Sequence, residues 1–102
     1  MKTVILDEAD AELTAAADWY ERERAGLGDE LLVEADRVLE AIAANPNTWP
    51  LVPGSGVVRR FLFTRFPYVA YFVVRDDQIV VLAFGHTSRK PGYWRDRLEP
   101  RS

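Results

Sequence analysis

The chain's only histidine, His86, is followed by a segment rich in cationic and aromatic side chains. This segment contains Arg89, Lys90, Tyr93, Trp94, Arg95 and Arg97. Arginine and lysine bind anionic groups, and Trp, Tyr and Arg carry much of the binding energy of protein interfaces. A histidine can also transfer a proton near neutral pH. The segment therefore indicates a binding or catalytic surface for an anionic partner.

Three β-type runs precede this segment and must position it. The β-branched and aromatic composition of the runs predicts strands near 57–64, 68–75 and 78–84, joined by short breaks at Pro67 and at Asp76-Asp77. The last two runs are apolar at nearly every position, which is typical of strands that are covered on both faces or central in a small sheet.

The first half of the chain predicts a short strand and two helices. Residues 3–6 form a β-branched run, and a first helix should run from Asp7 to about Arg24 with Glu12 facing away from its apolar stripe. A second helix should begin near Asp29 and end at Asn45-Pro46. A turn this short between two amphipathic helices predicts an antiparallel helix hairpin.

The predicted element order is β-α-α-β-β-β in a single domain spanning residues 1–102. We expect the helix hairpin to pack on one face of an antiparallel sheet, which is an α+β architecture.

Charge is distributed unevenly along the chain. Residues 1–56 carry 4 Lys and Arg against 12 Asp and Glu, a net −8, whereas residues 57–102 carry 9 against 4, a net +5. This asymmetry favours an anionic partner for the second half. A specific DNA-binding role for the chain alone is not expected, because its first half is so acidic.

Composition predicts a cytoplasmic protein without a cofactor. The absence of cysteine fits a reducing compartment, and the early acidic residues and lack of a long apolar run argue against a signal peptide or a membrane span. One histidine and no cysteine do not supply the usual ligands of a metal site.

Several short motifs, taken in order, resemble the RelE/ParE superfamily of toxins from type II toxin–antitoxin modules. They are the loop from Asn45-Pro46 to Trp49-Pro50, the Arg59-Arg60 pair, Arg65-Phe66-Pro67-Tyr68, the strand VVLAFGH, and His86 to Pro91 followed by Tyr93-Trp94 and Arg97. The resemblance implies a small toxin that a cognate antitoxin neutralises by wrapping across the helix hairpin and the sheet. It also implies one of two activities: RelE-like members cleave mRNA on the ribosome, and ParE-like members inhibit DNA gyrase.

RNA cleavage without a metal requires a base, an acid and cations that stabilise the phosphorane. A RelE-like site would use His86, Arg60, Arg65, Arg89 and Tyr93. The weak point is the base, because the carboxylates of the second half lie in a turn or near the end of the chain. His86 could alternatively be a strand-end histidine bonded to a backbone carbonyl.

Some of the arginines and aromatic residues could stabilise the fold instead of contacting a partner. Arg59 and Arg65 should share one face of a strand and Arg60 the other, so at least one should pair with a helix carboxylate or lie at the end of the sheet. Tyr93 and Trp94 could cap the core or contact a target. Trp19 and Tyr20 on the first helix are candidate antitoxin contacts.

We therefore favour a ParE-like toxin that acts by binding DNA gyrase and has no catalytic residues. The predicted target-binding residues are Arg65, His86, Arg89, Lys90, Tyr93, Trp94, Arg95 and Arg97. The first alternative is a RelE-like, ribosome-dependent endoribonuclease. The second is a non-toxic protein that retains only antitoxin binding.

Overall fold

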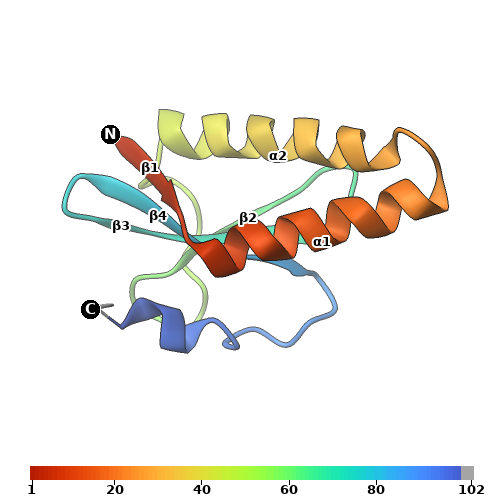
Figure 1. The fold of residues 1–102 in the computed structure, drawn as a ribbon. Helices are drawn as coiled ribbons and strands as arrows, with labels where there is room; N and C mark the ends of the chain where they lie inside the picture. Colours follow the sequence, from red (N-terminus) through yellow and green to blue (C-terminus); the bar gives the residue numbers. More distant parts are fainter. Residues whose placement is uncertain (100–102) are drawn as a thin grey trace.

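Four strands, two α-helices and one 3-10 helix follow one another along residues 1–99, the part of the chain that the computed structural model describes (Figure 1). Their bounds are β1 Lys2–Ile5, α1 Asp7–Glu23, α2 Leu27–Ala44, β2 Arg59–Leu62, β3 Tyr68–Arg75, β4 Gln78–His86 and η1 Arg95–Leu98. The predicted order of the helices and strands is confirmed, although β2 is shorter than predicted.

The four strands form one sheet in the order β1-β4-β3-β2. Strands β2, β3 and β4 make the predicted antiparallel meander, but β1 pairs with β4 in parallel. The sheet is therefore mixed, and the prediction of a wholly antiparallel sheet was wrong on this point. Apolar alternation identifies a strand but does not encode its direction relative to a distant neighbour.

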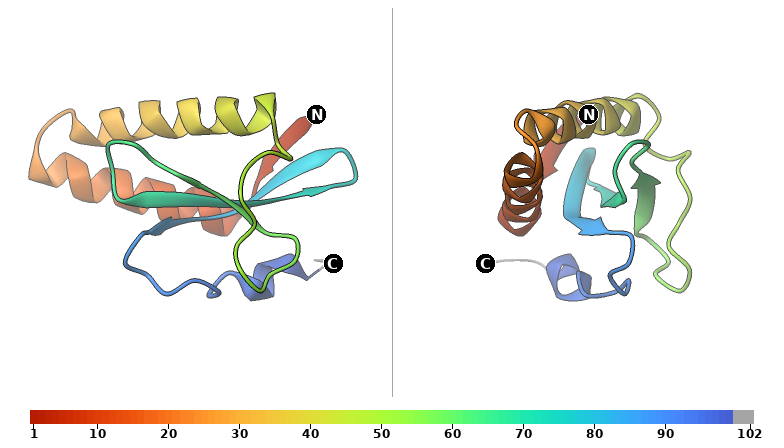
Figure 2. Two further views of the ribbon diagram at one scale, coloured as in Figure 1. Left: turned by 180° about the vertical axis from the view of Figure 1, so that it is seen from behind. Right: turned by 90° about the vertical axis from the view of Figure 1, so that its right-hand side faces the viewer.

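The helix hairpin covers one face of the sheet (Figure 2). Leu31 and Ile42 of α2 are fully buried and belong to one core cluster with Phe72 and Phe84 of the sheet. The helices approach closely at Gly28, where an added Cβ would collide with the carbonyl oxygen of Ala17 on α1.

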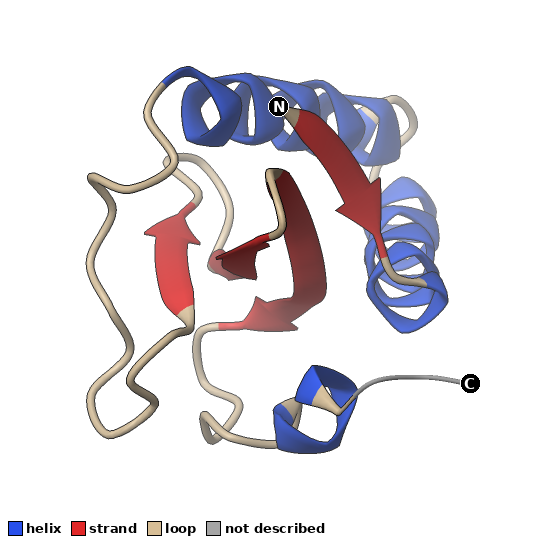
Figure 3. Cartoon of the chain, turned by 90° about the vertical axis from the view of Figure 1, so that its left-hand side faces the viewer, coloured by secondary structure: helices blue, strands red, loops and turns tan. Residues whose placement is uncertain are grey.

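The opposite face of the sheet is covered by the loop before β2 and by residues 87–99, which we call the tail (Figure 3). Val52 and Val58 of the loop and Trp94 of the tail are buried against Tyr71 and Leu82. Coverage of both faces explains why β3 and β4 are apolar at nearly every position.

A bulge in β4 helps to fix the tail. Tyr71 pairs with Ala83 and Phe72 pairs with Val81, so Leu82 is an extra residue in β4. Both Leu82 and Ala83 belong to the core of the second face. The carbonyl of Leu82 accepts a hydrogen bond from Arg97 of the tail at 2.9 Å.

The turn between β2 and β3 is held by a buried carboxylate of α2. Glu34 accepts hydrogen bonds from the backbone N–H groups of Thr64 and Arg65. These bonds compensate for burying the charge of Glu34, which is only 6% exposed. Within residues 1–99, no helix is both long enough and apolar enough to cross a membrane.

Candidate functional site

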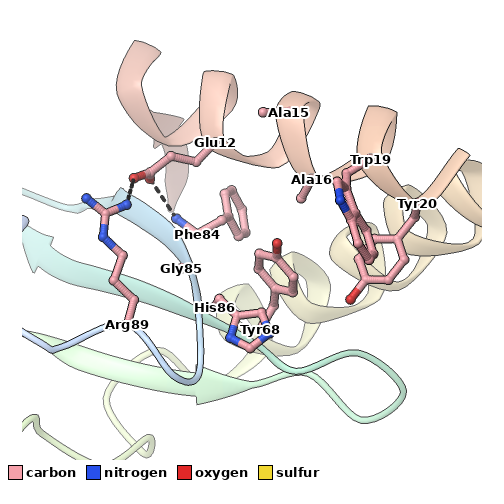
Figure 4. A pocket seen from close by; sticks show the side chains of 10 residues that line it. All are labelled: Glu12, Ala15, Ala16, Trp19, Tyr20, Tyr68, Phe84, Gly85, His86 and Arg89. Atoms are coloured by element: carbon pink, nitrogen blue, oxygen red, sulfur yellow. Dashed lines mark hydrogen bonds and ion pairs between the residues drawn. The ribbon is translucent and has the colours of Figure 1, made fainter. Parts of the chain in front are cut away.

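A groove of about 490 Å³ separates α1 from the C-terminal end of β4 (Figure 4). We call it the α1–β4 groove. Its lining is formed by Glu12, Ala15, Ala16, Trp19, Tyr20, Tyr68, Phe84, Gly85, His86 and Arg89. The aromatic rings of Trp19 and Tyr20 lie at one end, and the charged pair Glu12 and Arg89 lies at the other. Trp19 is 52% exposed, which is unusual for so large an apolar side chain.

Glu12 connects three parts of the chain at the charged end of the groove. Its carboxylate accepts the backbone N–H of Phe84 in β4 at 3.2 Å and two N–H groups of Arg97 at 2.9 and 3.1 Å. Arg89 forms a longer ion pair with it at 3.5 Å. The sequence pattern placed Glu12 away from the apolar stripe of α1 but did not predict that these contacts enclose it, and its side chain is only 17% exposed. Because its oxygens are occupied by these contacts, Glu12 is not a free base.

His86 lies at the end of β4 and is exposed to solvent. Its Nδ1 accepts the backbone N–H of Ser88 at 3.0 Å, so the neutral ring carries its proton on Nε2. The ring packs edge-on against Tyr68, with 5.4 Å between centroids. The partners of His86 are thus the amide and the hydroxyl of Ser88, the latter at 2.7 Å from Nδ1, rather than the carbonyl considered from the sequence.

Tyr93 lies between two arginines of the tail. The guanidinium of Arg89 is 3.5 Å from the ring centroid, and that of Arg97 is 5.4 Å away. The hydroxyl is buried against Gly85 and, within residues 1–99, has no hydrogen-bond partner. Burial, and secondly the charge of Glu12, raise the pKa of Tyr93 to about 12. The phenol therefore stays protonated at neutral pH.

The arginines of the predicted nuclease set do not meet at His86. Arg65 forms an ion pair with Glu30 of α2 at 2.6 Å, and this contact holds the pKa of the Glu30 carboxyl below its ordinary value. Arg60 pairs across the ladder with Tyr71, which belongs to the core of the opposite face. Among the predicted nuclease residues, only His86 and Arg89 line the α1–β4 groove.

Arg59 has a structural contact of the kind expected, but not with a carboxylate. Its guanidinium donates a hydrogen bond to the backbone carbonyl of Trp49 at 2.7 Å. This bond ties β2 to the preceding loop. The expected pairing of an arginine with a helix carboxylate occurs instead at Arg65.

The tail contributes less surface than the sequence suggested. Trp94 is fully buried, so the structure places it in the core rather than on a target-binding surface. The side chain of Arg97 is only 15% exposed, because it is enclosed with Glu12. Lys90 and Arg95 are exposed. The candidate contact surface of the tail is thus reduced mainly to Arg89, Lys90 and Arg95, with Tyr93 half-buried beside them.

Glu12 is the main residue of this site that the sequence reasoning missed. The signal available in the sequence was the acidic first half opposite a basic tail, but that signal does not select one carboxylate among several. No group of three or more metal-ligating side chains capable of holding an ion occurs within residues 1–99.

Known proteins resemble this chain in both sequence and structure. The family model described as "ParE toxin of type II toxin-antitoxin system, parDE" matches residues 4–91. A solved structure entitled "Chromosomal ParDE TA system from P. aeruginosa" aligns with a TM-score of 0.62 and 25% identity, over 84% of this chain and 95% of that chain. No curated protein matches.

The family match begins within β1 and includes α1, α2 and β2 to β4 together with His86, Arg89 and Lys90, and it stops before Tyr93. It thus includes the helix hairpin, most of the sheet and every residue that lines the α1–β4 groove. With the β-α-α-β-β-β order and the structural alignment over most of both chains, this match shows that the protein belongs to the ParE toxin family of type II toxin–antitoxin systems.

Proposed function

We propose that this protein is a cytoplasmic growth inhibitor that acts by binding DNA gyrase and is neutralised by a cognate antitoxin. Membership of the ParE toxin family supports the toxin role. The solved relative is described as a ParDE toxin–antitoxin system, which supports the existence of an antitoxin partner.

The observation that carries protein binding over RNA cleavage is the separation of the candidate nuclease groups. Arg65 is bound to Glu30, Arg89 is paired with Glu12, and Arg60 lies on the opposite face from the helices. Preorganised cations and an acid–base pair around one phosphate are required for cleavage. These side chains do not supply that arrangement.

The α1–β4 groove is the antitoxin site that we propose. Trp19 exposes half of its surface there, and Tyr20 packs edge-on against Trp19 with 5.0 Å between centroids. Exposed aromatic side chains beside an apolar groove are typical anchors of protein interfaces.

The exposed cations of the tail and of the β4 end are the gyrase-binding surface that we propose. Lys90 and Arg95 are exposed, and neither forms an ion pair within residues 1–99. Changing them breaks no ion pair within those residues; the guanidinium of Arg95 lies 5.8 Å from the centroid of the Trp94 ring.

Controlled expression of the protein distinguishes gyrase inhibition from mRNA cleavage and from antitoxin binding without toxicity. We expect growth to stop while DNA supercoiling fails and mRNA stays intact. The double variant Lys90→Glu with Arg95→Glu should relieve the arrest, because reversed charges oppose binding to the same anionic surface. Arg22→Glu on exposed α1 is the matched control and should leave the arrest unchanged.

Two other outcomes would decide against this function. Ribosome-dependent mRNA cleavage that disappears in His86→Ala would show that the protein is a RelE-like endoribonuclease and not a gyrase inhibitor. Unaffected growth, together with tight binding of the protein encoded by the adjacent gene, would identify a non-toxic antitoxin-binding protein.

A further inference from the structure

The backbone leaves β4 through a tight turn at residues 86–89. The carbonyl of His86 accepts the N–H of Arg89 at 3.0 Å, and this bond closes a β-turn. The N–H of Thr87 donates to the carbonyl of Pro67 at 2.8 Å, which ties the start of the turn to the residue before β3. The geometry of this turn therefore sets the direction in which the tail leaves the sheet.

The side chain of His86 occupies the first position of the turn, where Asp, Asn and Ser are favoured. The oxygen of such a side chain accepts the N–H two residues further along the chain. Here Nδ1 of the imidazole accepts the N–H of Ser88 at 3.0 Å, and the hydroxyl of Ser88 lies 2.7 Å from the same nitrogen. The ring also packs edge-on against Tyr68, its partner in β3. The imidazole thus stabilises the turn in the way that an Asn or Asp oxygen does elsewhere.

This acceptor exists only while the ring of His86 is neutral. Neutral imidazole has one donor and one acceptor nitrogen, whereas both nitrogens of the cation donate. Histidine changes its charge between about pH 5 and about pH 8, where an Asn oxygen is unaffected. Protonation therefore sets the N–H of Nδ1 against the N–H of Ser88. The Ser88 hydroxyl can rotate and accept the new proton, but the amide cannot reverse its role.

The groups around His86 do not provide a free anion for the protonated ring. The titratable and charged groups that line the groove with it or adjoin the turn are Tyr20 and Glu12 of α1, Tyr68 of β3, and Arg89 and Lys90 of the tail. Burial raises the pKa of both phenols, so they stay neutral. Glu12 is the one carboxylate among these groups, and it is already bound to Arg97 and paired with Arg89. A proton on His86 therefore adds to a local surplus of positive charge.

Arg89 closes the turn and lies at the charged end of the α1–β4 groove (Figure 4). Its guanidinium is 3.5 Å from the centroid of the Tyr93 ring and pairs with Glu12 at 3.5 Å. The side chain is 52% exposed, so its position depends on these contacts and on the turn rather than on burial. Lys90 follows directly in the chain. Opening of the turn therefore displaces both cations.

We propose that His86 is a positioning residue, whose neutral ring holds the turn at residues 86–89 and whose protonation releases Arg89 and Lys90. This inference rests on the proposed function, because Arg89 lines the proposed antitoxin groove and Lys90 belongs to the proposed gyrase-binding surface. The surface is ordered at neutral pH and loosened in mild acid. Because ordered side chains lose less entropy when they bind, antitoxin binding weakens as the pH falls.

NMR of the isolated full-length protein tests the turn without any partner. At neutral pH, the nitrogen shifts of the His86 ring should place its proton on Nε2, because Nδ1 is the acceptor. The methylene protons of Arg89 should carry a ring-current shift from Tyr93 and should lose it as His86 is protonated. A proton on Nδ1 at neutral pH, or an Arg89 shift that is unchanged while the ring titrates, would overturn the proposal.

Two variants distinguish the acceptor of His86 from its ring. His86→Asn retains an acceptor that does not titrate, so the Arg89 shift should persist from about pH 7.5 to about pH 5.5. His86→Phe retains an aromatic ring against Tyr68 but has no acceptor, so the shift should be reduced at both pH values. An equal pH response in the wild-type protein and in His86→Asn would contradict the role of Nδ1. Thermal unfolding verifies that both variants are folded.

Ser88→Ala tests the remaining contact of the protonated ring. This variant retains the amide but removes the hydroxyl that can accept the new proton. Acid should therefore release Arg89 more completely in Ser88→Ala than in the wild-type protein. A smaller release would show that the amide of Ser88 does not depend on the neutral ring.

Affinity for the full-length protein encoded by the adjacent gene connects the turn to binding. Between about pH 7.5 and about pH 5.5, the wild-type complex should weaken about tenfold more than the His86→Asn complex. Titration of the partner cancels, because the two ratios of affinity are compared. Equal ratios would overturn the proposal. If the adjacent-gene protein binds at neither pH, the proposed antitoxin interaction fails, and the Arg89 signal still decides the role of His86.

Discussion

The carboxylate of Glu12 holds the second half of β4 and the tail against α1. Strand β1 pairs with β4 only as far as Val81, so the N–H of Phe84 has no strand partner on that side. Glu12 accepts this N–H and also binds Arg97, which in turn donates to the carbonyl of Leu82. One side chain thus replaces a missing strand and fixes the tail.

Glu12→Gln should lower the free energy of unfolding by about 2 kcal/mol. The amide retains the shape of the carboxylate but loses the charge that compensates the enclosed guanidinium of Arg97, and hydrogen bonds to charged groups contribute most. Urea unfolding followed by fluorescence measures the change. Glu23→Gln, an exposed position at the end of the same helix, should change stability by less than about 0.5 kcal/mol. Equal losses in the two variants would contradict this role of Glu12.

At the level of elements, the tail packs directly on β4 through the smallest residue of that strand. An added Cβ at Gly85 would overlap the hydroxyl of Tyr93 and lie 3.2 Å from Cζ of the same ring. Glycine is needed at this position because the phenol occupies the space of a side chain. The ring itself is held between Arg89 and Arg97.

Gly85→Ala should therefore lower stability by about 1–3 kcal/mol, because the enclosed Tyr93 ring has to move. Tyr93→Phe alone should be nearly neutral, since the hydroxyl makes no hydrogen bond within residues 1–99. In the Tyr93→Phe background, the cost of Gly85→Ala should be smaller, because the closest atom is gone. A double-mutant cycle in urea measures this coupling, and additive effects would show that the two residues do not contact.

Across the whole molecule, the sheet depends on cover from both sides. The helix hairpin protects one face, and the loop before β2 together with the tail protects the other (Figures 1 and 3). Trp94 is among the largest fully buried side chains, yet it lies outside the residues that match the family model. The tail is therefore part of the folded core of this protein.

A chain that ends at Pro91 should lose cooperative unfolding and aggregate, although it retains all of the residues matched by the family model. It lacks Trp94 and Leu98, which pack on the second face, so the apolar surface of β3 and β4 becomes exposed. A chain that ends at Glu99 is the matched control and should unfold cooperatively. A soluble, cooperatively folded chain ending at Pro91 would show that the tail is dispensable. Size-exclusion chromatography and thermal unfolding distinguish the two results.

The order of the elements was predictable because it depends on local patterns. Helical spacing of apolar residues and the short turn between them indicated the helix hairpin, and runs of β-branched and aromatic residues indicated the three strands of the meander. The apolar character of β3 and β4 also indicated that both faces are covered. These features follow from residues that are close in sequence.

The composition of the site was decided by contacts between distant residues. Glu12 meets Arg97 across 85 positions, and Arg65 meets Glu30 across 35. Local periodicity assigns each charge to an exposed face but does not identify its partner, because any of several carboxylates has the same pattern. The same limit applies to Trp94, whose burial depends on where the tail returns to the sheet.

The sequence alone thus determined the family resemblance, the two helices, the meander and a basic tail. Only the tertiary structure decided that β1 runs parallel to β4, that Trp94 and Arg97 are enclosed, and that Arg65 is paired with Glu30 rather than placed in the groove of His86. Strand direction, the bulge at Leu82 and the closure of the tail arise from packing between segments remote in the chain. That packing assigns different partners to residues that a linear motif grouped together.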